Sequence, residues 1–155
     1  MPRIELHTRI NAPIERCFDL ARDVGAHCET AAFTRERVLP PGRTAGLLEL
    51  GDEVIFEAVH LGVRRRLRAR ITEMERPTRF VDEMVEGDFQ RLRHVHEFRR
   101  EGDVTVMRDV IEWTSPLGLL GRLADRLFVE RHLRWFLATK QAKLEGLAEE
   151  GQEPA

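Results

Sequence analysis

Residues 80–98 read FVDEMVEGDFQRLRHVHEF, and this stretch decides how the chain folds. Two runs that alternate between apolar and polar residues flank Gly87-Asp88, a dipeptide that favours a turn. Alternation with a period of two is typical of a half-buried β-strand. The stretch therefore predicts a β-hairpin. Its second strand presents His94 and His96 on one face, because side chains two apart in a strand point the same way.

The same alternation extends on both sides of this hairpin. Glycine and proline interrupt the alternation and divide it into long strands. We expect these strands at residues 52–60, 63–73, 79–86, 90–99 and 104–113. A half-buried first strand is expected over residues 4–10, well before the others.

Helical patterns stand before and after the long strands. Pro13 suits the first turn of a helix, since its missing N–H needs no partner there, and a helix is predicted over 13–22. A second short helix is expected over 26–33, and residues 40–46, PPGRTAG, read as a loop. The last helical pattern runs over 117–149. Its apolar face changes along the way, which indicates a bend or a helix covered on more than one side.

Composition limits the class of protein. The 155 residues are 42% hydrophobic and 34% charged, with a net charge of -2, which indicates a globular domain without an overall attraction to nucleic acid or to an anionic membrane. No apolar run is long enough to span a bilayer, so no integral membrane association is expected. The start lacks a signal-peptide pattern, and Cys17 and Cys28 make no disulfide framework, so we expect a cytoplasmic protein. A single domain is expected over 1–149, followed by a disordered tail over 150–155.

Tight hairpins align the strands so that opposite charges meet across one face. The hairpin pairs assumed here are His60–Val63, Glu86–Phe89 and Arg100–Asp103. The charge pairs that follow are Glu53–Arg70, Glu57–Arg66, Arg70–Asp82, Asp82–Arg93 and Arg91–Glu112. We assign this face to solvent and the stretch RRRLRAR at 64–70 to an ion-pair ladder rather than to a nucleic-acid site.

The opposite face of the predicted sheet is apolar and covered. Its apolar members are expected to be Val54, Phe56, Ala58, Leu67, Ala69, Ile71, Val81, Val85, Leu92, Phe98, Met107, Ile111 and Trp113. Glu83, His94, His96 and Asp109 fall on the same face, with His94 directly opposite Asp109. Unpaired buried charges are costly, so these four side chains either satisfy one another in the interior or line a ligand pocket.

Three segments of the chain resemble the START-like (helix-grip, SRPBCC) superfamily, and within it the bacterial polyketide cyclase/dehydrase and lipid-transport branch. They are INAPIERCFDLARD at 10–23, FVDEMVEGDFQRLRHVHEF at 80–98 and MRDVIEWTSPLGLLGRLADRLF at 107–128. The resemblance implies an α+β helix-grip fold, in which a curved antiparallel β-sheet wraps around a long C-terminal α-helix, with two short helices after strand 1. It does not fix the function, because this superfamily includes carriers, cyclases, hydrolases and sensors.

The resemblance also implies a deep apolar cavity that holds a lipid, an isoprenoid or a polyketide-like molecule. Carried onto this sequence, the ligand-binding candidates are Phe56, Leu67, Glu83, His94, His96, Met107, Asp109, Ile111, Trp113, Leu120, Leu123 and Leu127. Phe128 and Trp135 are further candidates from the helix. We therefore expect binding or transport of a hydrophobic small molecule, without a cofactor. Core packing is the alternative role for each apolar residue.

An enzyme is the alternative function. In a polyketide cyclase or dehydratase, His94 and Asp109 would act as an acid–base pair with Glu83 beside them. His94, His96 and Glu83 or Asp109 also offer donors for a metal ion. We predict no metal site, because the glycines that bracket a cupin motif are missing and Glu101 falls in a hairpin turn.

An interaction module is a third alternative. One apolar face of the C-terminal helix would then bind a partner or a second copy in a homodimer. The residues of this face are Val129, Leu133, Phe136 and Leu137.

Overall fold

The fold was analysed in a computed structural model, which describes residues 2–150; residues 151–155 of the predicted tail lie outside the described part. The strands are β1 (Arg3–Ile10), β2 (Arg37–Val38), β3 (Glu53–His60), β4 (Val63–Glu75), β5 (Arg79–Glu86), β6 (Arg91–Glu101) and β7 (Val104–Thr114). The helices are α1 (Ile14–Ala21), α2 (Val24–Thr30), the 3₁₀ turn η1 (Ala32–Thr34), α3 (Gly118–Ala124), the π-helical turn η2 (Asp125–Val129) and α4 (Glu130–Glu149).

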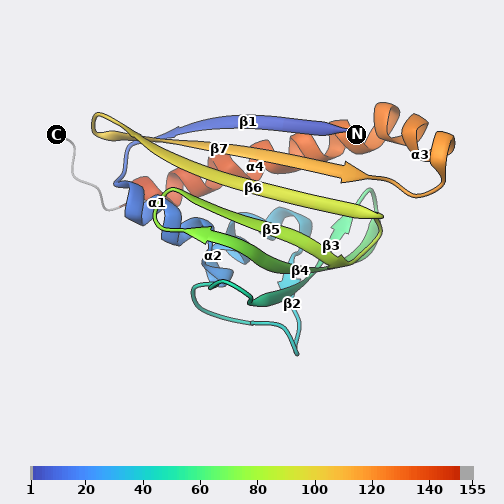
Figure 1. The fold of residues 1–155 in the computed structure, drawn as a ribbon, viewed down its shortest axis with the longest axis horizontal. Coiled ribbons are helices and arrows are strands. Elements are labelled where there is room, and N and C mark those ends of the chain that lie inside the picture. Colours follow the sequence, from blue (N-terminus) through green and yellow to red (C-terminus); the bar gives the residue numbers. More distant parts are fainter. Residues whose placement is uncertain (1, 151–155) are drawn as a thin grey trace.

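All seven strands form one antiparallel sheet in the order β1-β7-β6-β5-β4-β3-β2. The sheet curves, and α4 runs along its inner face while α1 and α2 cover the end where β1 leaves the sheet (Figure 1). The predicted α+β helix-grip fold is therefore confirmed. The helix expected over 26–33 divides into α2 and η1, and the sequence pattern did not predict the short strand β2.

The main core lies between the sheet, α1 and the C-terminal part of α4. Phe18 of α1 meets the rings of Phe80 and Phe98 edge-on, with centroid distances of 5.4 Å to each. Leu144 and Ala148 of α4 are buried in the same cluster. Each buried aromatic or leucine side chain contributes roughly 1.5–3 kcal/mol, so this end of the sheet is the most firmly packed.

The C-terminal helix bends at η2, as its change of apolar face predicts. A π-helical turn inserts an extra residue and rotates the following helix relative to the preceding one. Asp125, in this turn, is buried and accepts hydrogen bonds from Nε1 of Trp113 at 3.0 Å and from Oγ of Ser115 at 2.5 Å. The bend is thereby tied to the end of β7.

Ion pairs cover the outer face of β3 and β4, and the predicted pairs Glu53–Arg70 and Glu57–Arg66 are confirmed. The pairs on this face are Glu57 with Arg37, Arg64 and Arg66, and Glu53 with Arg68 and Arg70. The predicted pairs of Asp82 with Arg70 and Arg93 are wrong, because Asp82 pairs with His96. The β3–β4 register is the predicted one, with His60 opposite Val63. Hydrogen bonds from three guanidinium groups lower the pKa of Glu57 to about 2. The arginine-rich strand β4 is therefore largely neutralised by its neighbours.

The predicted register between β5 and β6 is wrong by one residue. Glu83 lies opposite Arg93, not opposite Leu92. A shift of one residue reverses the face of every side chain in the strand. Asp82 consequently points inward, and Glu83 points outward, where its carboxylate lies 3.6 Å from Arg93.

The cause is an ambiguous pattern in β5. Phe80 and Val81 are both apolar, so RFVDEMVE fits either phase, and the structure buries Phe80 in the main core. Residues 87–90 also form a longer connection than the two-residue turn that was assumed. Val81 and Val85 therefore leave the inner face, contrary to the prediction.

The predicted register between β6 and β7 is wrong by two residues. Arg100 lies opposite Thr105, and His96, rather than His94, is directly opposite Asp109. A shift of two residues preserves the face of each side chain. Both histidines therefore still point toward α4, as predicted.

Candidate functional site

A pocket of about 630 Å³ lies between the inner face of the sheet and α4. This volume falls within the range of roughly 300–1,000 Å³ that is usual for small-molecule sites. The walls are mostly apolar. Their apolar side chains include Val54, Phe56, Ala58, Leu67, Ala69, Ile71, Phe80, Leu92, Ile111, Leu120, Val129, Leu133, Phe136 and Leu137.

Several predicted site residues line this pocket. They are Phe56, Leu67, His94, His96, Ile111 and Leu120. Asp109 lies behind the two histidines and is completely buried. Met107 and Trp113 point inward as predicted, but both are completely buried in packed clusters and do not line the pocket.

The remaining candidates lie outside the pocket. Leu123, Leu127, Phe128 and Trp135 are between 51% and 60% exposed and form no part of its walls. Leu123 is exposed because α3 extends past the ends of the strands (Figure 1), whereas Trp135 of α4 packs edge-on against Phe33 outside the pocket. Glu83 is excluded because the shifted register of β5 turns it to the outer face.

The apolar face that was predicted to bind a partner is turned inward instead. Val129, Leu133, Phe136 and Leu137 all line the pocket, and Leu137 is only 1% exposed. These residues are therefore not available as a surface for a second copy. A homodimer remains a prediction that would need another interface.

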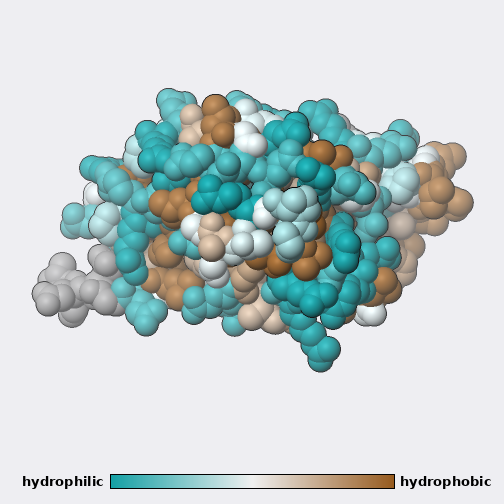
Figure 2. Space-filling model, turned by 90° about the horizontal axis from the view of Figure 1, so that it is seen from below, coloured by the Kyte–Doolittle hydropathy of each residue, from teal (hydrophilic) through white to brown (hydrophobic). Residues whose placement is uncertain are grey.

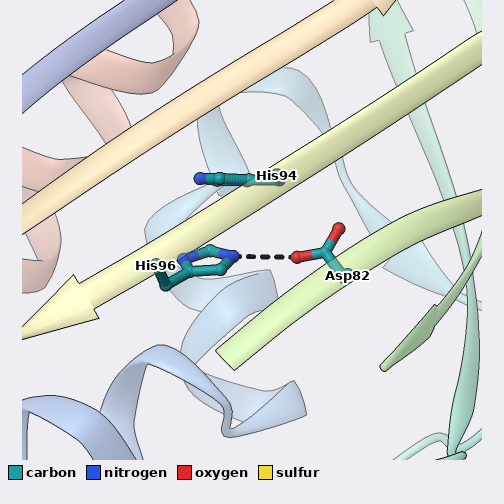
Figure 3. Close-up of side chains that lie close together, drawn as sticks. All are labelled: Asp82, His94 and His96. Atoms are coloured by element: carbon teal, nitrogen blue, oxygen red, sulfur yellow. Dashed lines mark hydrogen bonds and ion pairs between the residues drawn. The ribbon is translucent and has the colours of Figure 1, made fainter. Parts of the chain in front are cut away.

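Asp82, His94 and His96 converge on the sheet side of the pocket (Figure 3). Nε2 of His96 lies 2.8 Å from Oδ2 of Asp82, and Nε2 of His94 lies 2.9 Å from Oδ1 of Asp109. Nδ1 of His96 lies 3.1 Å from the same Asp109 oxygen. The two imidazole rings stack with their centroids 3.7 Å apart. The two carboxylates therefore hold both rings in defined orientations.

The cluster distributes its protons unequally. Burial lowers the pKa of His94 and outweighs its hydrogen bond to Asp109. Burial acts on His96 as well, but hydrogen bonds to Asp109 and Asp82 overcome it and raise the pKa of His96 above its ordinary value. Burial raises the pKa of both carboxyl groups, yet the bonds to the histidines hold it below the usual range. His96 is therefore the first of the two histidines to take a proton.

A second polar group faces the pocket from the helices. Nδ1 of His27 lies 2.7 Å from Oε2 of Glu36, and the His27 ring stacks on Phe56 with a centroid distance of 4.2 Å. Lys140 of α4 is buried in the pocket wall. Burial lowers the pKa of both Lys140 and His27.

These residues were not predicted from the sequence, although one signal was present. Lys140 and Lys143 are the only lysines in the chain, and Lys140 lies at helical spacing from Leu137 and Leu144 on the buried face of α4. A lysine on an apolar stripe indicates either a paired interior charge or a ligand contact. No local pattern singles out His27 or Glu36, because they meet Lys140 only through the tertiary fold.

Asp82, His94 and His96 also offer three donor atoms that lie within 4.8 Å of one another. Two imidazoles and one carboxylate suit several divalent transition metals. However, the rings stack at an interplanar angle of 27°, and the Nε2 atoms of both already face carboxylates. An ion would require both rings to turn, so the internal pairing is the simpler account. The absence of a metal remains a prediction.

Comparison with known proteins supports the fold. By sequence, the chain matches no protein-family profile and no curated protein. By structure, it is similar to TTHA0849 from Thermus thermophilus, with a TM-score of 0.78, 21% identity and coverage of 98% of this chain and 100% of that chain. It is also similar to a START superfamily protein from Mycobacterium smegmatis (TM-score 0.70, 13% identity, 95% and 97% of the two chains).

A plant protein extends this likeness. Major latex-like protein 151 from Panax ginseng matches with a TM-score of 0.67 at 13% identity, over 95% of this chain and 97% of that chain. At such identities the likeness defines the fold. The chain therefore has a START-like helix-grip fold over nearly its whole length.

Proposed function

We propose that the protein binds one hydrophobic small molecule, such as a lipid, an isoprenoid or a polyketide-like compound, in the pocket between the sheet and α4. The observation that carries the proposal is a pocket of about 630 Å³ whose walls are mostly apolar. Apolar burial contributes roughly 25 cal/mol per Å² and would supply most of the affinity. The START-like resemblance implies the same kind of ligand.

The charges around the pocket favour a neutral ligand. The charged side chains of the wall are three acids and three bases, namely Glu36, Asp82, Asp88, Arg65, Arg66 and Lys140. The wall therefore holds no excess of either sign that could pair with a charged ligand. Neutral His94 lies in the wall and can exchange a hydrogen bond with a hydroxyl or carbonyl group of the ligand.

A carrier role is part of this proposal. Reversible binding requires no reactive group, and His94 and His96 are each held by a hydrogen bond to a carboxylate. Among the described residues, no helix is long and apolar enough to cross a membrane. We propose the cytoplasm as the place where the protein acts.

Native mass spectrometry with a panel of fatty acids, isoprenoids and aromatic polyketides tests the proposal. Ala58 is 3% exposed and lines the pocket, so Ala58→Phe fills the binding volume, whereas Ala138→Phe adds the same ring on the exposed side of α4. We expect one neutral ligand per chain for the wild type and for Ala138→Phe, and at least tenfold weaker binding for Ala58→Phe. Binding of no compound by the folded wild type would refute the proposal.

An enzyme is the second candidate, favoured by one observation. His94 lines the pocket and bonds to fully buried Asp109 at 2.9 Å, so the pair can accept a proton next to a bound ligand. Such a pair suits the aldol cyclisation or dehydration of a polyketide. Glu83 takes no part, because it points outward. Turnover of a polyketide that persists unchanged in His94→Ala and Asp109→Ala would exclude this role for the pair.

A further inference from the structure

The surface around α3 is unusually apolar. Besides Leu120, six large apolar side chains there are between 51% and 79% exposed, namely Leu117, Leu119, Leu123, Leu127, Phe128 and Trp135. Hydrophobic residues gather at the end of the molecule where α3 lies (Figure 2). A concentration of large exposed apolar side chains in one segment of the chain indicates an interaction site. We call these six residues, together with Arg122, Arg126 and Arg131, the α3 surface.

The α3 surface also carries positive charge that is not neutralised. Arg122, Arg126 and Arg131 are exposed, and none of them forms an ion pair with a carboxylate in the described part of the chain. The two acids of the segment are engaged elsewhere: Asp125 is buried, and Glu130 lies 3.7 Å from an arginine one turn later. On the outer face of β3 and β4, by contrast, the arginines pair with glutamates, namely Arg64 and Arg66 with Glu57, and Arg68 and Arg70 with Glu53.

We infer that the α3 surface docks onto an anionic phospholipid bilayer. Leucine, phenylalanine and tryptophan side chains insert at the boundary between headgroups and acyl chains, while arginines bind lipid phosphates beside them. Arginine stems extend along apolar surface and keep the charged end at the headgroups. Such a segment lies in the interface and does not need the length of a membrane-spanning helix.

A second copy of the chain fits this surface less well. A symmetric dimer places the same patch on both subunits, so the unpaired arginines of one copy would face those of the other. Like charges in a desolvated interface oppose association. A lipid surface supplies the negative charge that a second copy lacks.

The α3 surface also adjoins the pocket. Leu117, Leu120, Gly121 and Ala124 contribute to the pocket wall from the same segment. A docked α3 would therefore place the pocket next to the lipid phase. The inference nevertheless stands on the exposed residues alone, and it goes beyond the proposed function, because docking needs no molecule in the pocket.

Vesicle co-sedimentation tests the inference. The wild type is compared on vesicles of phosphatidylcholine alone and of phosphatidylcholine mixed with phosphatidylglycerol. We expect binding to the mixed vesicles that weakens as salt is added. Leu119→Glu with Leu123→Glu should abolish it. Arg122→Glu with Arg126→Glu should weaken it by at least about 25-fold, since each basic residue near an anionic surface contributes about fivefold.

Matched controls place the same changes elsewhere. Leu50 is 62% exposed but precedes an acidic turn, and Arg99 is paired with Glu101, so Leu50→Glu and Arg99→Glu should leave vesicle binding unchanged. Equal binding to both vesicle types, or equal loss in the controls, would overturn the inference. So would a wild-type dimer, seen by light scattering, that the Leu119 and Leu123 substitutions dissociate.

One further variant separates this inference from the proposed function. Ala58→Phe fills the pocket but leaves the α3 surface intact, so it should bind mixed vesicles as the wild type does. Loss of vesicle binding in Ala58→Phe, with binding retained in the α3-surface variants, would show that lipid enters the pocket without the α3 surface.

Discussion

Asp109 is the residue on which the polar side of the pocket depends. It is completely buried, and one of its carboxylate oxygens faces ring nitrogens of both His94 and His96. Removing one partner from such a group leaves the others without compensation. Asp109 therefore determines both the orientation of the two imidazoles and the site of the proton in the pocket wall.

Replacing Asp109 by asparagine should destabilise the protein most under mildly acidic conditions. The raised pKa of His96 contributes stability that is fully present below about pH 6.5, the ordinary pKa of histidine, and is lost as the pH rises through the pKa of the folded state. The lowered pKa of Asp109 gives stability that is present above about 4 and is lost as the pH falls. Both contributions to the free energy of unfolding are therefore fully present between about pH 4 and about pH 6.5.

Urea unfolding at pH 5.5 and pH 9 measures the difference. We expect Asp109→Asn to cost about 3–5 kcal/mol at pH 5.5, where a buried charged pair is broken, and about 1.5–3 kcal/mol at pH 9, where the carboxylate loses hydrogen bonds to imidazoles that are neutral. Asp103→Asn, in the exposed β6–β7 turn, should cost little at either pH. A loss that is equal at both pH values, or larger at pH 9, would contradict the proton placement.

At the scale of the element, strand phase explains what the sequence could and could not predict. The strand β6 alternates cleanly, so the inward direction of His94 and His96 was predictable. The strand β5 carries adjacent apolar residues, so the side chains on its inner face were wrongly predicted. Glu83 was expected to point inward, whereas Asp82 does. Val81 finds an apolar environment on the outer face with Val95 and Val110, which no alternation of polar and apolar residues in β5 alone can indicate.

The corrected phase of β5 predicts unequal effects of two adjacent substitutions. Asp82 bonds to buried His96 at 2.8 Å, so Asp82→Ala removes a charged partner and should cost about 1.5–3 kcal/mol. Glu83 lies on the outer face, so Glu83→Ala should cost no more than about 0.5 kcal/mol. Chemical denaturation at pH 6 compares the two variants. A greater loss for Glu83→Ala than for Asp82→Ala would show that the β5 phase is misassigned.

At the scale of the whole molecule, the fold was predictable and the pocket only in part. Long alternating strands, an early helix and a long terminal helix are local patterns, and their order matches the START-like arrangement. His27, Glu36 and Lys140 line the same pocket because of the way α2 and α4 pack against the sheet. No local sequence pattern encodes this packing. The exposure of α3 likewise depends on where the strands end.

The distribution of charge is also a property of the whole molecule. The net charge of -2 conceals an uneven surface, because the arginines on the outer face of β4 are matched by glutamates of β3 while Arg122, Arg126 and Arg131 have no carboxylate partner in the described part of the chain. A composition-based expectation of no attraction to anionic surfaces averages over this difference. Local surface charge is therefore the better guide to partners.

If the space between the sheet and α4 holds one apolar molecule, the neutral probe Nile red should bind there, and a fluorescence titration measures this binding. We predict saturable binding of one probe per chain, unchanged in Ala138→Phe and at least tenfold weaker in Ala58→Phe. Binding that does not saturate, or equal binding by Ala58→Phe and the wild type, would place the probe on the surface and contradict binding in the pocket.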